Sequence, residues 1–325
     1  MIIIENKSNS ASFNLALEQH LLYNYKDEIF MLWQNEPSII VGKNQNAAAE
    51  INEEAVRKLK IPVVRRITGG GTVFHDLGNI TYTFILNDND GAGNFALCCE
   101  PIIEYLKSLG IDASLSGRND MVIGDKKFSG NAQCVHKGRL LHHGTLLFSG
   151  NIQTLTEVLT VNPLKIQSKG IKSVSSRVTN IAEHLKTPMT VEQFIAGIEG
   201  FISKKYPDIK VHKLTQEDIA QCNKLVEERY GNWEWNFGAS PKYMFHNGAY
   251  LKCGFVEAAL DIRDGYIEKA EIKGDFFFKK DICELCEKLV GIRHEFEQIK
   301  ALLEQVKVDD YIVNADADEI ARLML

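Results

Sequence analysis

The sequence lacks the long apolar runs and leader segments that place a protein in or across a membrane. No apolar stretch reaches the roughly 18 residues that suggest a membrane-spanning helix. The apolar start, residues 1–4, is too short for a secretory signal, and no basic region precedes it. Seven cysteines, an odd number, argue for free thiols rather than a disulfide framework. We therefore expect a cytoplasmic protein that does not bind membranes.

The chain also lacks an excess of charge of one sign. Its 37 basic and 43 acidic residues give a net charge of −6, which disfavours a protein that binds nucleic acid over its whole surface. With 45% hydrophobic and 25% charged residues, the composition excludes a disordered chain, a collagen and a bare coiled coil. The length of 325 residues predicts about two globular domains.

Three familiar cofactor motifs are missing. The sequence has no Walker A loop, Gly-x-x-x-x-Gly-Lys-Ser/Thr. Gly69-x-Gly71 begins like the dinucleotide fingerprint, but Phe74 replaces its last glycine and a strand is expected to follow. Cys283 and Cys286 have metal-ligand spacing, yet no second pair accompanies them, so we interpret them as ordinary helix positions.

Hydrophobic periodicity predicts an α+β fold. Apolar residues recur at every fourth position from Phe13 to Tyr25 and predict a helix over 12–26, with Ser12 as its N-cap. Residues 80–86 alternate, which predicts a half-buried strand with the even-numbered side chains on one face. Further strands are predicted at 30–33, 38–41, 62–67, 120–123, 127–128 and 140–148, and further helices at 50–60, 96–109, 151–159 and 191–206.

The pattern changes near Gly231. The segment from Trp233 to Pro241 holds two of the three tryptophans and ends in turn-forming residues. A second α+β pattern follows, with strands predicted at 250–255, 258–262 and 266–272 and helices at 279–290, 295–304 and 316–324. We therefore predict a large domain of residues 1–244 and a small domain of residues 245–325.

The densest group of chemically useful residues lies between Arg65 and Asp76. Three consecutive glycines, 69–71, let the backbone approach a ligand and point N–H groups at an anion. The neighbouring pair Arg65 and Arg66 can neutralise a phosphate or a carboxylate. The alternative is a glycine-rich connection between strands that binds nothing.

A second group spans residues 116–133. Asn119 and Asp120 supply oxygen ligands suited to magnesium, which takes one or two carboxylates together with phosphate oxygens. Lys127 lies on a predicted strand, where its charge is either a contact for phosphate or a solvated surface charge. A third group, residues 169–180, is basic and rich in hydroxyls, and its alternative is an exposed turn.

The histidines do not predict a metal site. His142 and His143 are neighbours on a predicted strand, so their side chains point to opposite faces. We interpret His75 as a residue that fixes a loop rather than as a base.

Taken together, these segments resemble the lipoate–protein ligase family. The matching stretches are residues 14–18, 65–79, 117–132, 142–147, 170–180 and 233–238, in that order. The resemblance covers most of the chain. It implies the fold of biotin and lipoate ligases, in which a mixed-sheet catalytic domain is followed, here, by a small C-terminal α/β accessory domain.

The resemblance implies an AMP-forming ligase that works in two steps. Lipoate and MgATP give lipoyl-AMP and pyrophosphate, and a lysine of a carrier protein then takes the lipoyl group as an amide. The implied carriers are apo lipoyl domains of 2-oxoacid dehydrogenases, on their E2 subunits, and the glycine-cleavage H protein. The enzyme is expected to be a monomer, and no covalent enzyme intermediate is implied.

The resemblance also implies individual roles. Lys127 matches the catalytic lysine, whose charge would offset the repulsion between lipoate and ATP. Asp120 matches the magnesium position, and residues 169–180 match a loop that closes over the adenylate. The implied ATP and adenylate residues are Arg66, Thr68, Gly71, Thr72, Val73, Phe74, Asn119, Lys127, Ser176 and Arg177. The implied lipoate residues are Leu17, Arg66, Gly70, Gly71, His75, Lys127 and Gly144. Cys134 replaces an arginine of some members, so it receives no role.

Four rival functions stay open. An acyltransferase of the same fold would use a cysteine nucleophile, and residues 115–127 contain none. A lipoyltransferase limited to preformed lipoyl-AMP would share the binding residues. A non-catalytic lipoate-binding protein would not need Lys127 and Asp120. Biotin ligation is disfavoured because the sequence has no Gly-Arg-Gly-Arg motif.

Overall fold

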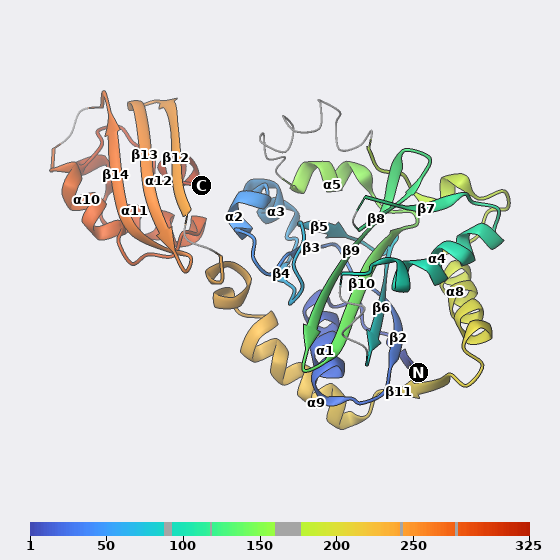
Figure 1. Ribbon diagram of the computed structural model, residues 1–325. Coiled ribbons are helices and arrows are strands. Elements are labelled where there is room, and N and C mark those ends of the chain that lie inside the picture. Colours follow the sequence, from blue (N-terminus) through green and yellow to red (C-terminus); the bar gives the residue numbers. More distant parts are fainter. Residues whose placement is uncertain (88–92, 118, 160–176, 241–242, 277–278) are drawn as a thin grey trace. The chain divides into compact units, whose positions relative to one another are not determined.

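The computed structural model describes residues 1–87, 93–117, 119–159, 177–240, 243–276 and 279–325. The chain forms two compact units, one of residues 1–43 and 50–232 and one of residues 44–49 and 233–325 (Figure 1). The boundary after residue 244 stays a prediction. None of the helices within the described ranges is long and apolar enough to cross a bilayer.

The first unit is built on an eight-stranded mixed sheet with strand order β11-β1-β2-β6-β10-β9-β8-β7. The strands are β1 (Ile2–Glu5), β2 (Ile29–Gln34), β6 (Asn79–Leu86), β7 (Ala113–Ser116), β8 (Asp120–Ile123), β9 (Lys126–His136), β10 (Arg139–Leu147) and β11 (Lys210–Lys213). β1 pairs in parallel with both of its neighbours, and the other pairs are antiparallel. The mixed sheet confirms the predicted fold class.

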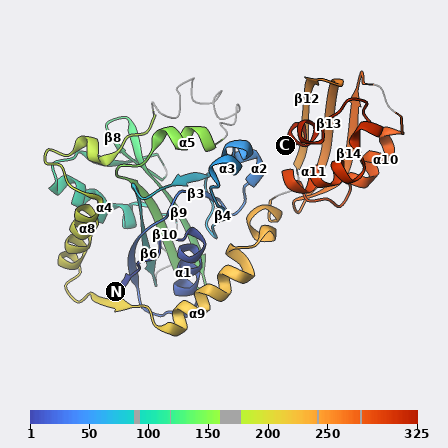
Figure 2. The same ribbon diagram turned by 180° about the vertical axis from the view of Figure 1, so that it is seen from behind.

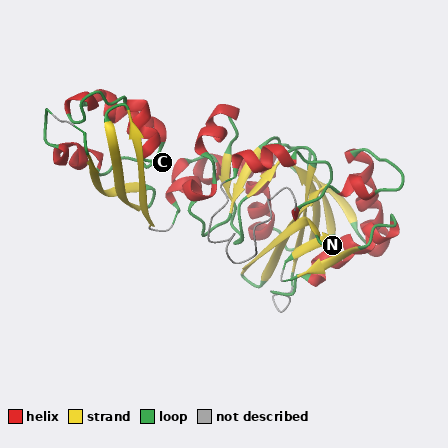
Figure 3. Ribbon diagram, turned by 90° about the horizontal axis from the view of Figure 1, so that it is seen from above, coloured by secondary structure: helices red, strands yellow, loops and turns green. Residues whose placement is uncertain are grey.

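Helices cover both faces of this sheet (Figures 1 and 3). They are α1 (Ala11–Asn24), α4 (Ala96–Ser108), α8 (Val191–Lys205) and α9 (Gln216–Leu225). A smaller sheet, β4-β3-β5, belongs to the same unit, as do α3 (Glu53–Leu59) and α5 (Ile152–Val158), whereas most of α2 (Ala47–Glu50) belongs to the second unit. The small sheet's strands are β3 (Ser38–Val41), β4 (Val63–Arg65) and β5 (Val73–His75). The view from behind shows α1 and α9 on the side of the sheet away from α4 and α8 (Figure 2).

The central strand β6 corrects one sequence prediction. Its even-numbered side chains do share a face, where they pack in one core with α4 and α8. The strand is buried on both faces rather than on one, because α1 covers the other face. On that face Thr83 donates a hydrogen bond to a residue of α1. The polar residues that alternate with apolar ones along β6 are therefore buried, not exposed to water.

Helix starts were partly mispredicted. α1 begins at Ala11 because the Ser10 hydroxyl accepts from the Phe13 N–H, whereas the Ser12 hydroxyl donates to a distant carbonyl. The helix predicted over 50–60 is α3, which begins only at Glu53 because Asn52 caps it, and residue 50 is instead the last residue of α2.

The second unit is a three-stranded antiparallel sheet, β12-β13-β14, with helices on one face. Its elements are β12 (Tyr243–Leu251), β13 (Gly254–Arg263), β14 (Tyr266–Gly274), α10 (Ile282–Leu289), α11 (Phe296–Gln305) and α12 (Ala317–Leu323). The predicted strands at 250–255 and 258–262 were wrong in their limits, because the chain turns at residues 252–253 and β13 continues unbroken. The small α/β domain itself is confirmed.

Candidate active site

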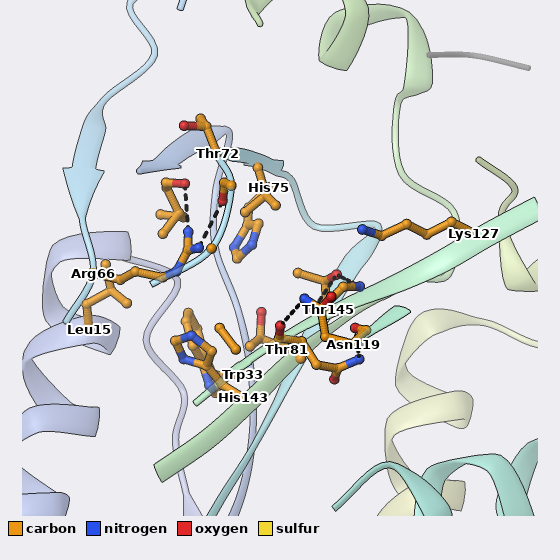
Figure 4. A pocket seen from close by; sticks show the side chains of 18 residues that line it. Leu15, Trp33, Arg66, Thr72, His75, Thr81, Asn119, Lys127, His143 and Thr145 are labelled. Atoms are coloured by element: carbon orange, nitrogen blue, oxygen red, sulfur yellow. Dashed lines mark hydrogen bonds between the residues drawn. The ribbon is translucent and has the colours of Figure 1, made fainter. Parts of the chain in front are cut away.

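A pocket of about 130 Å³ lies in the first unit, where α1, the small sheet and the strands β6, β9 and β10 meet (Figure 4). Its described lining is Leu15, Trp33, Ile40, Arg66, Gly70, Gly71, Thr72, Val73, His75, Thr81, Asn119, Lys127, Gly130, Asn131, Ala132, His143, Gly144 and Thr145. These lining residues are spread along the sequence from Leu15 to Thr145, and folding brings their separate sequence clusters together.

One wall of the pocket is apolar. Leu15 of α1, Trp33 of β2 and Ile40 of β3 supply it, and Ile40 and Trp33 are buried. Such a wall can hold an acyl chain by removing it from water.

A single ion pair lies at the pocket's β9 side. Lys127 Nζ is 2.7 Å from Asp120 Oδ1, and both side chains are more than a third exposed. Asp120 is not part of the described lining, whereas Lys127 is. In Figure 4 the lysine approaches the pocket from the side opposite Arg66. Because the pair is exposed, water and ligands can compete for either charge.

Two asparagines fix the strand beside Lys127. Asn119 donates from its side chain to the Asn131 carbonyl (2.7 Å), and Asn131 donates back to the Asn119 carbonyl (3.0 Å). The buried Tyr82 hydroxyl donates to Asn131 Oδ1 at 2.5 Å. Gly144 permits this packing, because a Cβ there would lie 1.9 Å from Asn131 Oδ1.

Arg66 organises the glycine loop. Its Nη2 donates to the carbonyls of Gly69 (2.6 Å) and Gly71 (2.9 Å), and its Nη1 donates to the Ile40 carbonyl (3.1 Å). Gly70 has a φ of +94°, and a Cβ on it would lie 2.9 Å from Arg66 Nη2. Burial lowers the pKa of Arg66 to about 10, so the guanidinium is charged at neutral pH. The loop is therefore shaped by one buried cation.

Two buried polar atoms face the pocket without a hydrogen-bond partner among the described residues: His75 Nε2 and Thr81 Oγ1. His75 Nδ1 is 3.0 Å from the Asn35 amide nitrogen, which must donate, so Nε2 carries the ring proton. Burial, with the charge of Arg66 nearby, lowers the pKa of His75 to about 3. The ring is thus neutral at pH 7, and its loop-fixing contact agrees with the sequence interpretation.

The two neighbouring histidines of β10 have separate partners, as their alternation predicts. His143 lines the pocket and contacts α1, whereas His142 contacts Tyr82 and Gln133. No cluster of three or more His, Cys, Asp or Glu side chains able to hold a metal exists among the described residues.

The predicted site residues divide into three groups. Arg66, Gly70, Gly71, Thr72, Val73, His75, Asn119, Lys127 and Gly144 come together in the pocket lining. Leu17, Thr68, Phe74, Asp120 and Arg177 lie outside that lining, and Ser176 falls outside the described residues, as does most of the predicted loop. Sequence reasoning missed Leu15, Trp33, Ile40, Thr81, Gly130, Asn131, Ala132, His143 and Thr145.

Fold and pocket together define the catalytic domain of a lipoyl ligase. The family model "Lipoyl protein ligase A/B catalytic domain" matches residues 10–201, and the model "Bacterial lipoate protein ligase C-terminus" matches residues 240–324. The chain belongs to the lipoate–protein ligase family.

Two bacterial relatives and two solved structures are similar to this chain over most or all of its length. Lipoate–protein ligase 1 of Staphylococcus aureus (strain Mu50) is 42% identical, with 99% of each chain covered, and lipoate-protein ligase LplJ of Bacillus subtilis (strain 168) is 40% identical, with 100% covered. The solved structure of Plasmodium falciparum LipL1 in complex with lipoate has a TM-score of 0.62 at 29% identity and covers 99% of this chain and 98% of its own. The bi-partite lipoate protein ligase of Thermoplasma acidophilum, solved in work on that ligase and its E2 lipoyl domain, has a TM-score of 0.66 at 26% identity and covers 74% and 98%.

Proposed function

We propose that this ligase activates free lipoate with MgATP and transfers the lipoyl group to a lysine of a carrier domain. In the first step a lipoate carboxylate oxygen attacks the α-phosphorus of ATP, the bond to the β-phosphate oxygen breaks, and pyrophosphate leaves. In the second step a neutral lysine amine of the carrier attacks the acyl carbon, AMP leaves, and the amine loses a proton as the amide forms.

The pocket's combination of an apolar wall with a cation at its edge carries this proposal. The wall formed by Leu15, Trp33 and Ile40 suits the carbon chain of lipoate, and Lys127, which also lines the pocket, is assigned to the end where the carboxylate meets ATP. Two anions must approach each other there, and a fixed ammonium lowers the cost of that approach and stabilises the charge that builds on the phosphate. The unpartnered His75 Nε2–H is a further donor for an oxygen of the bound acid.

The nucleotide is assigned to two segments of the lining. Gly71 belongs to the loop that Arg66 holds and is followed by Thr72 and Val73, and Asn119 directly precedes Asp120 of the ion pair. Thr68, Phe74, Ser176 and Arg177 complete the set by family resemblance. We assign no nucleophile, and the described lining contains no cysteine, which disfavours the thioester route.

Magnesium fits the residues present. The Asp120 carboxylate and the Asn119 amide offer the hard oxygen donors that Mg²⁺ takes, and most of its other ligands would come from phosphate and water. This suits a site without a third acidic or imidazole ligand among the described residues. Bound there, Mg²⁺ would neutralise phosphate charge; the protein's part is to hold Asp120 and Lys127 2.7 Å apart.

The proposed partners are apo lipoyl domains of 2-oxoacid dehydrogenase E2 subunits and the glycine-cleavage H protein. The likeness to the archaeal ligase described with its E2 lipoyl domain supports the lipoyl-domain class. A lipoyl domain offers one exposed lysine on a small fold, which can reach a pocket that opens to solvent at Lys127.

One assay tests the reaction and its rivals. ATP–pyrophosphate exchange is measured with lipoate, octanoate or biotin, and an apo lipoyl domain is then added. We expect exchange with lipoate and a mass increase of the carrier. Transfer from synthetic lipoyl-AMP without any exchange would instead show a transferase limited to preformed adenylate, and binding without either reaction would show a non-catalytic protein.

A further inference from the structure

A fully buried carboxylate stands behind the pocket. Glu18 of α1 is 0% exposed and does not line the pocket. It accepts hydrogen bonds from His143 Nδ1 (2.9 and 3.0 Å) and from the Thr83 hydroxyl (2.6 Å). Burying a carboxylate costs several kcal/mol unless it is paired, and an apolar residue would stabilise a helix core more cheaply. Glu18 therefore depends on the hydrogen bonds that it accepts.

One chain of hydrogen bonds leads from Glu18 to the glycine loop. His143 Nε2 is 2.7 Å from Thr68 Oγ1, and Thr68 Oγ1 accepts from Arg66 Nε at 2.9 Å. His143 thus contacts the Thr68 hydroxyl through Nε2 and the Glu18 carboxylate through Nδ1. This arginine arm (Arg66, Thr68 and His143) joins the guanidinium to the carboxylate through hydrogen bonds.

A second chain leads from Glu18 to the apolar wall. Trp33 Nε1 donates to Thr83 Oγ1 at 2.9 Å, and Thr83 donates to Glu18 Oε1. This tryptophan arm (Trp33 and Thr83) orients an indole that lines the pocket. One carboxylate is the common end of both arms.

We propose that Glu18 is a positioning residue for the ligase reaction. Through the arginine arm it fixes the glycine loop assigned to the nucleotide, and through the tryptophan arm it fixes the wall assigned to the lipoyl chain. It also supplies the nearby negative charge that the buried Arg66 guanidinium requires. The inference rests on the proposed function, because the glycine loop and the apolar wall need a fixed position only if the nucleotide and lipoate bind between them.

The substitution Glu18→Gln isolates this role. Glutamine keeps the size of the side chain but replaces one acceptor oxygen by an NH₂ donor. That donor must face either the His143 N–H or the Thr83 hydroxyl proton, so one arm has to reverse or separate. A displacement of about 1 Å at a reacting centre can cost about 100-fold in rate.

The experiment uses full-length protein and lipoate-dependent ATP–pyrophosphate exchange. Glu18→Gln and Thr68→Val should each lower kcat/KM for ATP by about 10- to 100-fold, whereas Thr83→Val should mainly raise KM for lipoate. Because the arginine arm acts as a unit, the double variant Glu18→Gln/Thr68→Val should be no more than about threefold worse than the worse single variant.

A second buried pair on the same helix provides a matched control. His20 Nε2 lies 2.8 Å from Asp218 Oδ1, and neither residue lines the pocket. Asp218→Asn should lower the melting temperature and leave both kinetic constants unchanged. The same kinetic loss in Asp218→Asn, multiplied losses in the double variant, or wild-type kinetics in Thr68→Val would overturn the proposal. If Glu18→Gln does not fold, Thr83→Val decides, because Thr83 is assigned to neither ligand and contacts both Glu18 and Trp33; an unchanged KM for lipoate in Thr83→Val would then overturn the proposal.

The wild-type assay separates this inference from the proposed function. Wild-type protein without any lipoate-dependent exchange would refute the proposed function. In that case calorimetry of lipoate binding tests the tryptophan arm. If Glu18 positions the apolar wall, Thr83→Val must weaken the affinity for lipoate.

Discussion

The two units of the chain keep their charged groups in different places. The first unit buries Glu18, Arg65, Arg66 and Asp218, whereas the second unit, in its described part, buries no acidic or basic side chain other than His294. Its ion pairs, such as Lys279 with Asp309, lie at the surface. A core of aliphatic and aromatic residues stabilises it. The difference teaches that the first unit, which holds the pocket, accepts the cost of buried charge, whereas the second unit does not in its described part.

The largest effect is expected at Lys127, a pocket cation that reaches solvent. Lys127→Ala should lower the rate of lipoyl-AMP formation by about 10²- to 10³-fold, because a preorganised charge is lost from the transition state. Lys127→Arg should not restore it fully, since a planar guanidinium cannot occupy the position of a compact ammonium. Pyrophosphate exchange measures the rate, and an unchanged melting temperature confirms the fold. Wild-type adenylation by Lys127→Ala would sink the assignment.

Acid should destabilise the first unit through its neutral histidines. Burial lowers the pKa of His142 to about 3, whereas an unfolded histidine titrates near pH 6.5. Between these values the unfolded state binds more protons, so the free energy of unfolding falls as the pH falls. From pH 7 to pH 5 one such histidine removes roughly 2 kcal/mol. Urea unfolding of His142→Gln should show a correspondingly smaller drop; an identical drop would contradict the buried, neutral ring.

A smaller effect is expected at Asp120. Asp120→Asn should raise the magnesium concentration needed for half-maximal adenylation about tenfold, because a neutral amide replaces the charged oxygen ligand. Transfer from preformed lipoyl-AMP should change less. Magnesium titrations of both half-reactions measure this, and superimposable titrations of variant and wild type would remove Asp120 from the metal position.

The smallest effect is expected at the surface of the second unit. Lys279→Ala breaks the pair with Asp309, and both side chains are about half exposed. The melting temperature should stay within about 2 °C and adenylation within about twofold, since exposed pairs contribute little. Differential scanning calorimetry checks this. A large loss would show that charge placement does not distinguish the two units.

Local patterns predicted much of this fold. The apolar stripe from Phe13 to Tyr25 predicted α1. The alternation over residues 80–86 predicted which side chains of β6 share the core-facing side of the strand. The strands β1 and β11 were not predicted, because they are held by a pairing that joins Ile2 to Lys210. No local pattern encodes a parallel partner so distant in sequence.

The pocket was predicted where its residues are clustered along the chain. The glycine loop and the Asn119 to Lys127 segment are such clusters, and both line it. Leu17 was placed in the lipoate set, yet Leu15 lines the pocket. α1 is buried on nearly every side, so its periodicity cannot show which side faces the ligand. One clue was available: a carboxylate, Glu18, in the middle of that apolar helix.

The pairing of β1 with β11 has a consequence for synthesis on the ribosome. The first strand of the protein, residues 2–5, has one of its two neighbours only after residue 213 has left the exit tunnel. Until then β1, with its three isoleucines, forms the edge of the growing sheet, and an apolar edge can pair with other chains; afterwards the edge strand is β11, which carries Lys210 and Lys213. A fragment covering residues 10–201 would lack both strands and end its sheet at β2, a buried strand whose residues 29–33 would then lie along an unpaired edge.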